Sequence, residues 1–145
     1  ALLQTQGQAP QPVWTNPNLA GAFQSAVVLG GHAYGFGRAG QDQVLQSIEV
    51  GTGTLKWSRD LGAWGSLIAV NDILVVIDGD GDMVLAEASP KAYRELTRMR
   101  AINITPREAA DHDNLRACWT NPAFAEGRIF VRDNFGEVVC VEPKA

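Results

Sequence analysis

The stretch Ser47-Ile-Glu-Val-Gly-Thr-Gly-Thr-Leu-Lys-Trp57 decides the fold of this chain. The alternating run from Val44 to Val50 has the two-residue period of a β-strand. It stops at Gly51-Thr52-Gly53, where glycines accept the positive φ of a tight turn, and a second short strand follows from Thr54 to Ser58. We therefore expect two antiparallel strands that close on Trp57.

Composition indicates one ordinary globular domain with a hydrophobic core. Of the 145 residues, 46% are hydrophobic and 19% charged, and the net charge is −4. Because lysines and arginines form no cluster, we expect neither a nucleic-acid partner nor binding to an anionic membrane. No apolar run reaches the roughly 18 residues of a membrane span. Ala1-Leu2-Leu3 is too short for a signal-peptide core, which predicts a cytoplasmic chain or a targeting segment outside this sequence.

Three segments share one pattern. An aromatic residue opens each, a small polar residue follows two positions later, and a two-residue turn separates two apolar strands. The second begins 41 residues after the first, which matches the roughly 40 to 45 residues of one four-stranded propeller blade. The third begins 55 residues after the second, which indicates an insertion. The segments are Phe23–Phe36, Trp64–Ile77 and Trp119–Arg132, with turns at Gly30-Gly31, Asn71-Asp72 and Glu126-Gly127.

The downstream halves align as well. Ile77–Glu87 lies over Arg132–Glu142, each a hairpin with a glycine at its turn, so each unit supplies strands A, B and C. The Trp57 segment supplies strand D of the first unit. In the second unit Tyr93–Ile102 is the expected strand D, with Leu96 where a tryptophan would stand. The expected layout is a flexible lead-in at 1–12, blades at about 13–62, 63–102 and 117–145, and an insertion loop at 103–116.

The Trp57 segment resembles the tryptophan-docking motif of the quinoprotein (PQQ-like) β-propeller repeat, Ala-x-Asp-x-x-Thr-Gly-x-x-x-Trp. Thr52, Gly53 and Trp57 match the motif, whereas Ser47 and Glu49 replace its Ala and Asp. The resemblance covers residues 13–145 and is to the C-terminal blades of bacterial proteins of this kind. It implies an all-β fold of about three four-stranded antiparallel blades, and an exported protein of the periplasm or cell surface. It also implies that docking tryptophans pack between blades, a role we assign to Trp14, Trp57, Trp64 and Trp119.

An arc of three blades is incomplete, because closed propellers have four to eight. We expect both outer faces of the arc to be exposed and the segment to belong to a longer or assembled propeller. A strand at Val13-Trp14 and a last blade without strand D are complementary, so two copies of the chain could pair head to tail.

The run Asp78-Gly-Asp-Gly-Asp82 resembles the start of a calcium loop. An EF-hand needs Gly at the sixth position and Glu at the twelfth, where this chain has Met83 and Ser89. Because a hairpin turn also selects Asp and Gly, we favour a solvated turn over a cation site at Asp78, Asp80 and Asp82.

No residues form a recognisable catalytic set. Asp111-His112-Asp113 is interpreted as solvated loop, since His32 is the one other histidine. Ser25, Ser66 and Asn121 recur at one strand-A position, which favours structural hydrogen bonds near the propeller axis over nucleophiles.

The two cysteines, Cys118 and Cys140, are interpreted as buried and reduced. A disulfide is the alternative, although the expected register places the two residues apart. No zinc-type spacing is present.

These observations predict a non-catalytic PQQ-like repeat module that acts as a protein-binding scaffold, without a cofactor. Its partner would be another protein, further blades of the same propeller, or a second copy of the chain. One alternative is a fragment of a quinone-dependent dehydrogenase, which would require PQQ and calcium. Another is a carbohydrate-binding propeller, which needs Trp64 and Trp119 exposed.

Overall fold

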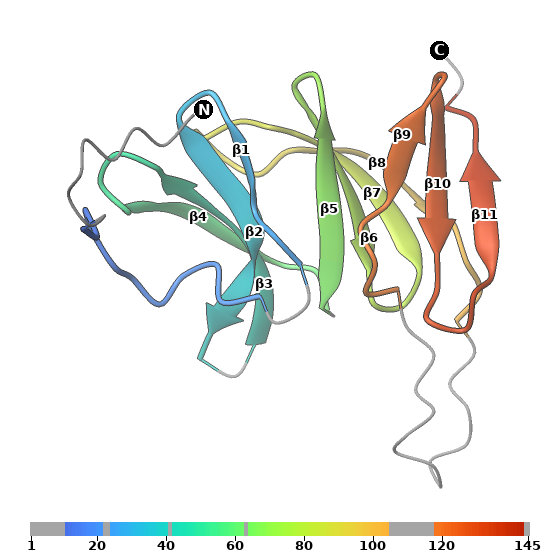
Figure 1. The fold of residues 1–145 in the computed structure, drawn as a ribbon, viewed down its shortest axis with the longest axis horizontal. Helices are drawn as coiled ribbons and strands as arrows, with labels where there is room; N and C mark the ends of the chain where they lie inside the picture. Colours follow the sequence, from blue (N-terminus) through green and yellow to red (C-terminus); the bar gives the residue numbers. More distant parts are fainter. Residues whose placement is uncertain (1–10, 22–23, 41, 63, 105–117, 144–145) are drawn as a thin grey trace, which may run out of the picture.

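The computed structural model describes residues 11–21, 24–40, 42–62, 64–104 and 118–143. These residues form three antiparallel β-sheets that stand side by side, with no helix among them (Figure 1). Nothing in the described ranges is a helix of the length and apolarity that crossing a bilayer requires. The strands are β1 (Val27–Leu29), β2 (His32–Ala39), β3 (Asp42–Glu49), β4 (Leu55–Asp60), β5 (Gly65–Val70), β6 (Ile73–Asp78), β7 (Asp82–Glu87), β8 (Glu95–Arg100), β9 (Ala123–Ala125), β10 (Arg128–Arg132) and β11 (Val138–Val141).

Each sheet is built from consecutive strands. The orders are β1-β2-β3-β4, β5-β6-β7-β8 and β11-β10-β9, and every neighbouring pair is antiparallel. The first two strands of each sheet meet at the predicted two-residue turns, where Asn71 and Glu126 adopt φ of 55° and 50°. The predicted fold class, all-β with about three antiparallel blades, is therefore confirmed: two sheets have the four strands predicted, and the third has three among the described residues.

The second sheet is buried on both faces. Side chains of β6 alternate between two apolar clusters because successive residues of a strand point to opposite faces. Seam 1, between the first and second sheets, is built around Tyr34, Phe36, Leu45, Leu67, Leu74, Val76 and Val84. Seam 2, between the second and third sheets, is built around Val75, Ile77, Met83, Ile102, Cys118, Ile129 and Val131.

Trp57 joins the first sheet to the second. Its indole ring lies 6.1 Å from the Tyr34 ring and 5.8 Å from the Tyr93 ring, measured between centroids. The indole Nε1 donates a hydrogen bond of 2.8 Å to the carbonyl oxygen of Ser89, on the connection between β7 and β8. The side chain therefore contributes both apolar contact and a polar anchor across seam 1.

Trp14 makes a comparable contact with the turn between β3 and β4 of the first sheet. Its Nε1 donates to the carbonyl oxygen of Val50 at 2.7 Å, and its ring lies over Gly53. Gly53 has φ of 73°, and a Cβ at this position would lie 2.9 Å from the Trp14 ring. The motif therefore needs glycine here both for the turn and for the approach of the indole.

The segment that carries Trp14 differs from prediction in two ways. Val13-Trp14 is not a strand, so the expected strand at this position is wrong. The segment instead lies against the outer face of the first sheet: the Leu19 amide donates to Gln46 Oε1 at 3.0 Å, and Gln46 is buried. The prediction that both outer faces are exposed is therefore wrong for the part of the first sheet around Gln46, because this irregular segment covers that side chain and hydrogen-bonds to it.

The outer face of the third sheet is exposed. Phe130 and Cys140 pair across β10 and β11, and both are exposed, as is Val138. The prediction of two buried cysteines is therefore wrong for Cys140, because strand alternation turns it away from seam 2. Cys118 is buried in seam 2, and no disulfide joins the two residues.

We predict that Trp57→Ala lowers the free energy of unfolding by about 3 kcal/mol, at the lower end of the range for tryptophan truncation because Trp57 is half-buried. Trp57→Phe should cost about 1 kcal/mol, since it keeps a ring but loses the hydrogen bond to Ser89. Urea unfolding measures both changes.

Leu55→Ala, an exposed change on the same strand, is the matched control and should stay within about 0.5 kcal/mol of the wild type. Equal effects of Trp57→Ala and Leu55→Ala would contradict the bridging role of Trp57.

Candidate functional site

The turn of the docking motif is held by its own polar residues. The Thr52 hydroxyl donates to Glu49 Oε2 at 2.7 Å, and the Gly53 amide donates to the Glu49 carbonyl at 2.8 Å. The hydrogen bond from Thr52, helped by the charge of Lys56, holds the pKa of Glu49 below its usual value. Glu49 thus accepts a hydrogen bond at the position where the motif has Asp.

The Asp78 run is a hairpin turn. Asp78 Oδ1 accepts hydrogen bonds from the amides of Asp80 and Asp82, at 3.1 and 2.9 Å. In the third sheet, Asp133 Oδ1 accepts from the amides two and four residues later, at 3.0 and 2.8 Å. Both of these aspartates are buried, whereas Asp80 is exposed and Asp82 half-buried. The expectation of a solvated turn is therefore wrong for Asp78 and agrees with the exposure of Asp80. Burial raises the pKa of the Asp78 carboxyl, and the amide of Asp82 opposes the rise.

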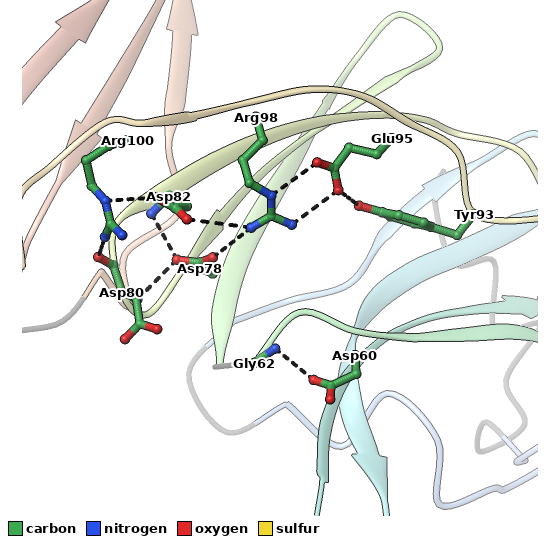
Figure 2. Close-up of polar contacts among 9 residues, drawn as sticks. All are labelled: Asp60, Gly62, Asp78, Asp80, Asp82, Tyr93, Glu95, Arg98 and Arg100. Carbon is green, nitrogen blue, oxygen red and sulfur yellow. Dashed lines mark hydrogen bonds and ion pairs between the residues drawn. The ribbon is translucent and has the colours of Figure 1, made fainter.

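Ion pairs tie β8 to this turn (Figure 2). The Arg98 guanidinium holds Glu95 through two hydrogen bonds of 3.1 and 3.2 Å and reaches Asp78 Oδ2 at 3.4 Å. Arg100 Nε lies 2.8 Å from Asp82 Oδ1, and Arg100 also donates to the Asp80 carbonyl. The outer strand of the second sheet is thereby fixed to its inner hairpin by side chains as well as by the strand ladder.

Tyr93 extends the network toward the first sheet. Its hydroxyl donates to Glu95 Oε2 at 2.7 Å, and the Arg59 guanidinium lies 5.4 Å from the centre of its ring. Burial and the hydrogen bond to Glu95 raise the pKa of Tyr93, whereas the hydrogen bond from Arg98 lowers the pKa of Glu95. The carboxylates of Asp78, Asp82 and Glu95 each have a donor or cationic partner, which suits a structural clamp.

The candidate cation ligands do not converge on a metal position. Asp78 and Asp82 face the guanidinium groups of Arg98 and Arg100, which a cation would have to displace. The Asp80 carboxylate points away from these two (Figure 2). Across the part of the chain that the structure describes, no three His, Cys, Asp or Glu residues are placed to hold a metal ion. The described residues therefore do not fit a resident calcium ion.

The repeated strand-A residues have different surroundings. Ser66 is buried, and its hydroxyl donates to the Thr120 carbonyl at 2.8 Å, which joins the second sheet to the segment before β9. Ser25 and Asn121 are exposed. Asp111-His112-Asp113 and most of the expected insertion loop lie outside the described residues.

Trp64 and Trp119 are both half-buried. Trp64 packs against seam 1, and the guanidinium of Arg38 lies 5.8 Å from the centre of its ring. The arrangement does not present Trp64 as an open platform for a sugar ring.

Sequence reasoning missed two features of β8. The register pairs Ser47 with Trp57 and Leu85 with Thr97, and each pair is followed by a shift of one residue. Thr97, not Leu96, therefore occupies the position of Trp57. The ion pairs of Glu95, Arg98 and Arg100 also depend on this register, and the signal for them in the sequence was only the alternation of charged residues in the expected strand D.

Comparisons with known proteins show the fold. No protein-family model and no curated protein sequence matches the chain. Among solved structures, it is similar to a europium-containing methanol dehydrogenase, with a TM-score of 0.62 and 14% identity over 89% of this chain. The match covers 24% of the dehydrogenase, so the chain spans about a quarter of that protein's length. The three sheets therefore resemble blades of a quinoprotein-like β-propeller.

Two computationally designed proteins are also similar. Ika4 gives a TM-score of 0.47 and 11% identity, over 94% of this chain and 100% of the designed one. Ika8 gives a TM-score of 0.38 and 10% identity, over 83% of this chain and 45% of the designed one.

We predict that Asp78→Ala lowers the free energy of unfolding by about 1 to 3 kcal/mol, because two amides of the turn lose their acceptor in a buried place. Asp80→Ala keeps the backbone contacts and removes an exposed side chain, so it should change stability by less than about 0.5 kcal/mol. Urea unfolding of both variants tests this, and equal effects would argue against the capping role of Asp78.

The network also predicts a pH dependence. Because Arg98 lowers the pKa of Glu95 in the folded state, Glu95 contributes stability above its unfolded pKa of about 4.5 and loses it as pH falls through the lower folded value. The stability difference between wild type and Glu95→Gln should therefore be present at pH 7, under about 1 kcal/mol for this exposed pair, and vanish near pH 3. Urea unfolding at the two pH values measures it, and a difference that grows at pH 3 would refute the assignment.

Proposed function

We propose that this chain is a non-catalytic propeller segment that binds protein through the outer face of its third sheet. The observation that carries the proposal is that strand positions buried in the other two sheets are exposed in the third. The partner that fits this face is a further four-stranded blade of the same repeat.

Equivalent positions are identified by counting from the two-residue turn of each sheet. The third residue after the turn is Tyr34, Val75 and Phe130 in the three sheets, with exposed fractions of 1%, 2% and 36%. On the next strand, Val138 and Met83 correspond, because each pairs with the fifth residue after the turn, Arg132 or Ile77. The exposed fraction of Val138 is 59%, and that of Met83 is 3%. The third sheet thus carries the apolar residues of a seam without a facing sheet.

The proposed surface continues the two seams already formed. In seam 1, Tyr34 of the first sheet packs in one cluster with aliphatic side chains of the second sheet. In seam 2, Val75 of the second sheet packs in one cluster with aliphatic side chains of the third. Covering Phe130 and Val138 with another blade would remove their apolar surface from water at about 25 cal/mol per Å². β11 pairs with β10 and, among the described strands, with no other, so its free edge suits a strand D from the partner.

The polar residues support a scaffold rather than an enzyme. The carboxylates of Asp78, Asp82 and Glu95 are engaged by arginines, which leaves none of them poised as a general base.

A fragment of a quinone-dependent dehydrogenase is the second candidate, and the fold likeness to a methanol dehydrogenase favours it. The described residues offer no set of metal ligands that would accompany such a cofactor. Addition of quinone and calcium separates the two candidates. A visible absorbance change with a thermal shift supports the dehydrogenase, whereas the absence of both changes supports the scaffold.

We predict that the 145-residue chain self-associates through this face when no further blade covers it. Light scattering should give a mass above that of the 15.6 kDa monomer, increasing with concentration. The double change Phe130→Ser and Val138→Lys should restore the monomer mass, because it replaces exposed apolar side chains with polar ones.

Leu55→Lys is the matched control, since Leu55 is an exposed apolar residue on β4, away from the third sheet. It should associate as the wild type does. A wild-type chain with the monomer mass at all concentrations and a normal melting transition would overturn the proposed surface.

A further inference from the structure

Seam 2 contains a pocket of about 150 Å³. The pocket lies beside the turn between β5 and β6, where the second and third sheets face each other. Its walls are almost entirely apolar. The lining residues are Val70, Asn71, Ile73, Val75, Leu85, Phe124, Ile129 and Pro143.

The same walls in seam 1 surround an indole ring. Val75 has the position of Tyr34, the third residue after the turn, and Tyr34 is in ring contact with Trp57. On the facing sheet, Ile129 has the position of Leu74, the second residue after the turn, and Leu74 belongs to the cluster against which Trp57 packs. The pocket therefore occupies in seam 2 the place that the Trp57 side chain fills in seam 1.

The register explains why this place is unfilled. Trp57 pairs with Ser47 and Thr97 pairs with Leu85, so Thr97 is the counterpart of Trp57. Directly paired residues of antiparallel strands point to the same face of a sheet. Leu85 packs in seam 2, so the register places Thr97 on the same face of the sheet. Thr97 is exposed and is not among the residues that line the pocket, because its side chain is too short to replace an indole.

We propose that the seam 2 pocket is a vacant tryptophan-docking site that binds a planar, uncharged aromatic group. Its walls suit this class because they offer aliphatic side chains from two sheets and the aromatic side chain of Phe124. An apolar cavity of similar volume is sufficient to bind benzene in another protein, and the solvent-facing side of this pocket leaves room for a larger ring. This site is separate from the outer face of the third sheet and does not depend on its function.

Indole is the probe for the experiment, carried out on the 145-residue chain. Titration should produce saturable NMR shifts of the methyl groups of Val75, Leu85 and Ile129, with smaller shifts of the seam 1 methyls of Leu74 and Val76. Thr97→Trp should fill the pocket with its own side chain. This variant should melt about 5 °C above the wild type and bind indole at least roughly tenfold more weakly.

Leu96→Trp is the matched control, because it adds an indole one residue away from the docking position. It should bind indole as the wild type does and show no rise in melting temperature. The wild-type titration decides even if a variant fails to fold: without saturable shifts at the three methyl groups, the proposal is wrong. A folded Thr97→Trp chain that binds indole with wild-type affinity would overturn it as well.

Discussion

The structure depends on the burial of the second sheet on both of its faces. β6 is apolar from Ile73 to Ile77 rather than alternating, because each of its faces meets another sheet. Neither face can be exposed without placing aliphatic side chains in water, so the three sheets stabilise one another. The polar residue that ends the strand, Asp78, is buried as well, and it is accommodated by the turn amides and by Arg98.

The two seams are related by the repeat but differ in composition. Seam 1 is aromatic, with Tyr34, Phe36 and Trp57 between the sheets, and the indole is anchored to a backbone carbonyl. Seam 2 is aliphatic, with Thr97 at the tryptophan position and a pocket beside it. A repeat protein is stabilised by its units and by the interfaces between neighbours, so a change at one interface leaves the others in place. The register at the docking position is thus the same in both sheets, whereas the tryptophan side chain is present in one of them.

The charged residues complement this apolar arrangement. β8 is exposed along its length and carries Arg98 and Arg100, with Arg94 directly before it, and charges on an outer strand discourage pairing with another sheet edge. The same arginines bind the carboxylates of Glu87, Asp78, Asp82 and Glu95. One set of side chains therefore protects the edge and fixes the outer strand to the sheet.

The sequence by itself determined the strands, their turns and their grouping into three repeats, because two-residue alternation and turn-forming glycines are local properties of the chain. It also identified Thr52, Gly53 and Trp57 as one unit, since the turn and the indole are close in sequence. It could not determine that Thr97 rather than Leu96 replaces the tryptophan, because the one-residue shift between β7 and β8 is set by pairing across the sheet. The sequence also predicted the exposed outer face of the third sheet, whereas the cover over the first sheet and the pocket in seam 2 were decided only by the tertiary structure. Each of these depends on which residues distant in sequence face one another.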